Sequence, residues 1–145
     1  MTRDDILPLL RRGILALLLL GTAGLIPELV LLEHYDDPFQ FVPFALLGST
    51  IVVTLWHWKD GGRRSLRVFQ LMMALLILAA PAGIYFHLTG NYTTEHDFDP
   101  SVLGLDLWLA VIRGDAPALA PGTLAQFGLL GLLYSYQHPA LDQRA

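Results

Sequence analysis

The chain contains no cysteine. This absence excludes disulfide bonds, thiolate nucleophiles and thiolate metal ligands, so any metal ion must be bound by imidazole, carboxylate or carbonyl groups. The sequence also lacks a nucleophile elbow, a phosphate-binding loop, an HExxH pair and an EF-hand loop. We therefore favour a protein that is not an enzyme.

Charge is almost absent from four long stretches of the chain. Of its 145 residues 54% are hydrophobic and the mean hydropathy is +0.50, which is high for a soluble domain of this size. At a rise of about 1.5 Å per residue, a helix of about 20 residues covers the hydrocarbon thickness of a bilayer. The sequence predicts an all-α integral membrane protein, a single domain built as a four-transmembrane-helix bundle. Its predicted spans are residues 13–32, 38–58, 68–86 and 116–137.

Basic residues are rare in two of the connections between these stretches. Eight of the nine lie in the N-terminal, second and C-terminal connections, whereas the first and third connections hold eight acidic residues and only Arg113. Because cytoplasmic loops are enriched in Lys and Arg, this sorting predicts a plasma (inner) membrane protein with both termini in the cytoplasm. The outer acidic residues are Glu33, Asp36, Asp37, Glu95, Asp97, Asp99, Asp106 and Asp115. We expect the lipid bilayer and other membrane protein subunits as partners, and no nucleic acid.

The third connection contains a helical pattern that is too short to cross a membrane. Asp99 and Pro100 are typical of a helix start, and an apolar-rich segment follows to Arg113. Crossing would place Asp106 in the middle of the bilayer, at a high energetic cost. We therefore predict an interfacial helix over residues 100–113 on the outer side. Asn91 precedes it in an Asn-Tyr-Thr glycosylation sequon.

Histidine and acidic residues follow the first and third stretches. Imidazole and carboxylate groups are suitable ligands for a divalent metal cation, so these residues indicate a cation site at the outer mouth of the bundle. The alternative is that acids remain outside simply because basic residues are sorted to the inside. The candidate metal ligands are Glu28, Glu33, His34, Asp37, His87, Glu95 and His96.

Glu28 differs from the other candidates because it lies within a predicted span. An ionised carboxylate there costs several kcal/mol unless it is paired, hydrated or protonated. Two interpretations follow: a carboxylate that handles protons or cations, or a side chain that extends to the outer headgroups.

Four histidines close the predicted spans and suggest a haem alternative. His34 and His87 end spans on the outer side, whereas His57 and His138 end spans on the inner side, so each pair could supply two axial ligands. The sequence thus supports three functions in order. The first is a non-catalytic accessory component of a membrane assembly or transport system, the second a haem- or quinone-linked electron-transfer subunit, and the third a metal-dependent membrane-embedded hydrolase.

Overall fold

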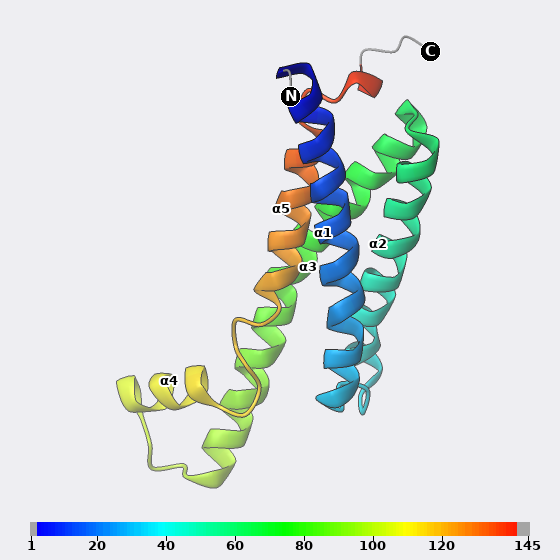
Figure 1. Cartoon of the computed structure of the whole chain (residues 1–145). Coiled ribbons are helices and arrows are strands. Elements are labelled where there is room, and N and C mark those ends of the chain that lie inside the picture. Colours follow the sequence, from blue (N-terminus) through cyan, green and yellow to red (C-terminus); the bar gives the residue numbers. More distant parts are fainter. Residues whose placement is uncertain (1–2, 142–145) are drawn as a thin grey trace. The chain divides into compact units, whose positions relative to one another are not determined.

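The computed structural model describes residues 3–141, with side chains from Ile6 onward, and this part of the chain is all-helical. The prediction of an all-α protein is therefore confirmed. The described residues form two compact units, one comprising residues up to Leu76 together with those from Phe127, the other comprising Ile77–Gln126. The elements, shown in Figure 1, are α1 (Arg3–Leu31), η1 (Pro38–Gln40), α2 (Phe41–Asp60), α3 (Arg63–Phe98), α4 (Gly104–Arg113), α5 (Gly122–Ser135) and η2 (Pro139–Leu141).

The core of the first unit consists of one stripe of buried residues from each helix. The members of each stripe are three or four positions apart, which is the spacing that keeps residues on one helix face. In α2 the stripe is largely polar, because threonines and a histidine occupy three of its four positions. The stripes are Leu15, Leu18 and Thr22 in α1, Leu47, Thr50, Thr54 and His57 in α2, and Leu66, Phe69 and Met73 in α3.

Glycine permits two close helix contacts in the first unit. A Cβ atom added to Gly21 of α1 would lie 2.6 Å from the ring of Phe127, and one added to Gly131 of α5 would overlap Met73 of α3. Small residues allow apolar helices to approach in this way, as the sequence suggests for both positions. Gly24, by contrast, faces open space.

The outward surface of these helices is apolar. Leu20, Leu31 and Leu71 are 72%, 79% and 62% exposed, whereas a water-soluble protein exposes few such contiguous patches. Three segments are long and apolar enough to cross a membrane, namely Ile6–Leu31, Pro38–Asp60 and Arg63–Phe98. These features are typical of helices that face lipid.

Helices α3 and α5 differ in length from the predicted spans. α3 continues twelve residues beyond the predicted end at Phe86 because no proline interrupts it before Asp99-Pro100, and Thr89 and Thr93 bond to carbonyls within the helix. α5 has 14 residues, or about 21 Å at the α-helical rise. It is shorter than predicted because residues 117–124 begin as turns, in which amides bond to carbonyls three positions earlier.

In the second unit, α4 confirms the end of the short helix but not its beginning. The predicted start at Pro100 is wrong, because Asp99 accepts hydrogen bonds from the amide and hydroxyl of Ser101 and forms a separate turn. These bonds hold the pKa of Asp99 below its usual range. Gly104, with φ of 65°, then turns the chain into α4. One face of α4 exposes Leu105, Trp108 and Ile112.

Asn91 holds the second unit together. Its side-chain nitrogen donates hydrogen bonds to the carbonyls of Val111 and Ala116, and its oxygen accepts one from the amide of Ala116. The residue is only 3% exposed. The sequon is therefore not available for glycosylation in this fold, because the nitrogen that would carry the glycan is buried and bonded.

Candidate functional site

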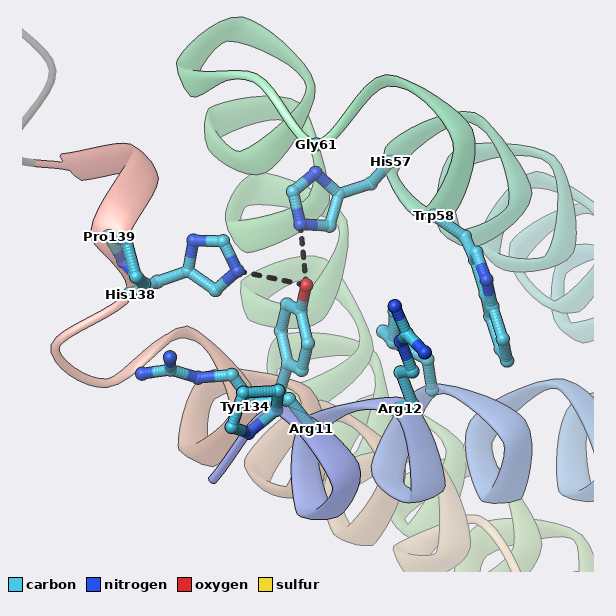
Figure 2. A pocket seen from close by; sticks show the side chains of 10 residues that line it. Arg11, Arg12, His57, Trp58, Gly61, Tyr134, His138 and Pro139 are labelled. Atoms are coloured by element: carbon cyan, nitrogen blue, oxygen red, sulfur yellow. Dashed lines mark hydrogen bonds between the residues drawn. The ribbon is translucent and has the colours of Figure 1, made fainter. Parts of the chain in front are cut away.

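A polar pocket lies at the end of the first unit where α1 begins and where α2 and α5 end. Its volume is about 440 Å³. Two arginines of α1, Arg11 and Arg12, line it together with Trp58 and two histidines, His57 and His138 (Figure 2). No acidic residue is among those that line it.

Five side chains form a continuous chain of hydrogen bonds beside this pocket. His138 Nε2 lies 3.0 Å from the hydroxyl of Tyr134, which lies 2.8 Å from His57 Nε2 (Figure 2). On the other side of the His57 ring, Nδ1 lies 2.9 Å from the hydroxyl of Ser65, and that hydroxyl lies 2.6 Å from the carboxylate of Asp60. The chain joins the last turn of α2, the first turn of α3 and the end of α5.

The donors in this chain all point in one direction. The amide of Ala140 donates to His138 Nδ1, so a neutral His138 carries its proton on Nε2 and donates to Tyr134. At the other end the Asp60 carboxylate accepts from Ser65, so Ser65 must accept from His57 Nδ1. Tyr134 then donates to His57 Nε2. Every side chain in between thereby has one donor and one acceptor role, and the buried polar groups are satisfied.

His138 is held in its neutral form. Burial lowers the pKa of His138 to about 4, and the positive charge of Arg11 and the nearby His57 lower it further. Near neutral pH the positive charge at the pocket therefore comes from Arg11 and Arg12. An arginine keeps its charge throughout the physiological pH range.

The two arginines have different surroundings. Arg11 donates hydrogen bonds to the carbonyls of Tyr136 and Gln137, which lie just beyond the last turn of α5 and lack intrahelical partners. This contact joins α1 to the end of α5. Arg12 is exposed at the pocket, and no described residue forms a hydrogen bond or ion pair with its side chain.

The turn between α2 and α3 positions half of the hydrogen-bonded chain. Gly61 ends α2 in the left-handed conformation with φ of 61°, and its amide bonds to the carbonyl of His57. The amide of Gly62 then donates to the Asp60 carboxylate. The glycine pair thus turns the chain within two residues, as the sequence predicts, and brings Ser65 back to His57.

Of the two predicted histidine pairs, His57 and His138 lie close together within one unit. Their ring centroids are 5.5 Å apart. A haem iron between them would require both Nε2 atoms as ligands, but the Tyr134 hydroxyl already bonds to both. The residues in this arrangement therefore do not fit a haem. His34 belongs to the first unit and His87, which bonds to the carbonyl of Pro117, to the second.

The predicted metal ligands are distributed over both units. Glu28, Glu33, His34 and Asp37 are in the first unit, and His87, Glu95 and His96 in the second. Within residues 3–141 no group of three or more His, Asp or Glu side chains could hold a metal ion. The cation site stays a prediction. Glu28 lies on the exposed side of α1, and the ring of His96 stacks on Tyr92.

Two of these candidates have local roles in the backbone. Glu33 has φ of 52°, and the bonds from its amide to Val30 and from the His34 amide to Leu29 form the Schellman ending of α1. Asp37 accepts a hydrogen bond from the Phe39 amide and caps η1. Both acids therefore shape the turn between α1 and α2.

Several pocket residues were not predicted from the sequence as site residues. Arg11 and Arg12 counted only as inner basic residues, and Tyr134 only as an interfacial anchor. A signal was present, because Tyr134 and His138 are four residues apart, a spacing that brings side chains together on one helix face. His57 had no such local signal, since its partner Tyr134 is 77 positions away.

Searches of protein families, curated proteins and solved structures found no match to this chain.

Proposed function

We propose that the protein is a non-catalytic integral membrane protein that binds an anion in the pocket beside Arg11 and Arg12. The observation that carries this proposal is the convergence of two arginines on a pocket lined by no acidic residue. Guanidinium groups suit phosphate and carboxylate oxygens because they present several donors in a fixed plane. The neutral His138 supports the same conclusion, since it adds hydrogen-bonding capacity without a titrating charge.

Binding of inorganic phosphate to the purified protein in neutral detergent tests this proposal. We expect saturable line broadening in ³¹P NMR spectra for the wild type, and affinity weakened about tenfold by Arg12→Gln, because a charge-assisted contact contributes about 1.4 kcal/mol or more. Arg64→Gln is the matched control, since it removes one positive charge from an exposed residue that does not line the pocket. Equal affinity in all three proteins, or no saturable binding, would refute the proposal.

We further propose four membrane spans, with both termini on the cytoplasmic side and α4 at the outer interface. The sorting of basic residues supports the orientation, and the exposed apolar face of α4 supports its interfacial position. Hydrogen bonds from Arg11 to the segment after α5 are consistent with both chain ends lying on one side. The short α5 would then cross with the aid of its flanking turns.

The absence of cysteine makes this topology directly testable. Single cysteines placed at Asp36, Arg64, Ser101 and Gln143 can be labelled in intact cells with a membrane-impermeant maleimide. We expect labelling at Asp36 and Ser101 only. Labelling of Gln143→Cys from outside would show that α5 does not cross.

For its biological role we propose an accessory component of a membrane assembly or transport system. The support is limited to size and composition, since a chain of 145 residues without a catalytic motif is suited to binding rather than to reaction. Purification from native membranes in mild detergent, followed by mass spectrometry, is the test. A solitary species after chemical cross-linking in the membrane would contradict an accessory role.

A further inference from the structure

A second hollow adjoins the pocket on the surface between α1 and α2. It has a volume of about 350 Å³ and is lined by Leu19, Leu55, Trp58 and Lys59. Trp58 lines the pocket as well, so the two hollows meet at its side chain. All of these residues belong to the first unit.

Polarity changes along this surface in a single direction. Arg11, Leu15 and Leu19 are spaced by four residues and lie on one face of α1, over about 12 Å of helix. The face begins with a cation and ends with a leucine. On α2 the order is the same, because Lys59 and Trp58 precede Leu55 on the way from the helix end toward its middle.

Resting on the proposed anion site, we propose that an anionic glycerophospholipid occupies both hollows. Its phosphate lies against Arg11 and Arg12, and one acyl chain runs along Leu19 and Leu55. Basic pockets at the cytoplasmic ends of membrane helices are suited to such headgroups. Trp58 suits the boundary, since its ring packs against hydrocarbon while its indole N–H can donate to ester or phosphate oxygens.

Charge distinguishes an anionic lipid from a zwitterionic one. Three cations, Arg11, Arg12 and Lys59, line the two hollows, and no acid does. A choline headgroup would bring its own positive charge close to these side chains. The apolar groove, in turn, distinguishes a lipid from free phosphate, because free phosphate makes no use of Leu19 or Leu55.

The test is lipid retention by the full-length protein in native mass spectrometry. Protein in nanodiscs of equal parts phosphatidylglycerol and phosphatidylcholine is released into detergent, and we expect phosphatidylglycerol to be retained about tenfold more often. Arg12→Gln should reduce that preference about tenfold, whereas Arg64→Gln should leave it unchanged. Leu19→Phe fills the groove and should reduce retention of phosphatidylglycerol, whereas Leu17→Phe, on an exposed position outside both hollows, should not.

Inorganic phosphate separates this inference from the proposed function. If phosphate binds through Arg12 but Leu19→Phe leaves lipid retention unchanged, the lipid proposal is wrong and the anion site stands. If Leu19→Phe lowers lipid retention while phosphate binding is unaffected, both are supported. Loss of both ligands' binding in the wild type would overturn both, and equal retention of the two lipids would overturn the lipid proposal alone.

Discussion

The two ends of the first unit use their polar residues in different ways. At the pocket end, side chains from α2, α3 and α5 bond to one another, and the hydrogen bond between His57 and Tyr134 joins residues 77 positions apart. At the other end, Glu33 and Asp37 act on their own turn, through the ending of α1 and the cap of η1. The richer cluster in the sequence is thus a turn, and the poorer one is an assembled site.

The largest effect expected is from His57→Leu. The substitution removes two hydrogen bonds from a side chain that is only 1% exposed and leaves a poorly filled space. We expect the free energy of unfolding in mixed micelles to fall by about 3 kcal/mol. Thr54→Val is the matched control one turn away, because the buried Thr54 hydroxyl has no hydrogen-bond partner among the described residues and its loss should be neutral or stabilising. A loss below about 1 kcal/mol for His57→Leu would mean that the hydrogen-bonded chain contributes little to the fold.

The pocket end should also be the acid-sensitive end. His138 titrates at about 4 in the folded protein and near 6.5 when unfolded, so the unfolded state binds the extra proton first as the pH falls. Its contribution to stability is complete above pH 6.5 and is lost progressively between pH 6.5 and 4. Thermal unfolding midpoints of wild type and His138→Gln across this range should converge as the pH falls. A constant difference between the two proteins would show that His138 does not titrate in this way.

The sequence predicted the helical class and the membrane-facing composition because both depend on local patterns of apolar residues. The end of α4 at Arg113 and the turn at Gly61 were also predictable, since single residues determine them. The pocket was not, because Arg11, His57 and Tyr134 come from separate helices and no local spacing relates them. The extension of α3 was missed for a different reason: polar residues after Phe86 mark the end of an apolar stretch, but they do not end a helix.

A smaller effect is expected at the other end of the first unit from Asp37→Ala. Its carboxylate receives the Phe39 amide at 2.8 Å, and Gln40 bonds back to the Asp37 amide, so the capping box would be broken. The expected loss is about 1 kcal/mol in the free energy of unfolding. Asp36→Ala is the control, because it removes the same charge from the same turn without removing a cap. Equal losses in both variants would indicate that charge, rather than capping, is what Asp37 supplies.

The smallest effect, and the sharpest test of the contrast, is expected from Glu33→Gly. A glutamate at φ of 52° is strained, whereas glycine adopts this conformation freely, so the variant should be more stable by about 0.5–1 kcal/mol. Glu33→Gln is the control, since it removes the charge and keeps the strain. If Glu33 were instead a metal ligand, wild type alone would gain stability on addition of Ca²⁺ or Zn²⁺, and both variants would lose that gain. A rise in stability for Glu33→Gly that is independent of added cation would assign Glu33 to the turn, and a cation-dependent loss would make the outer end a second assembled site.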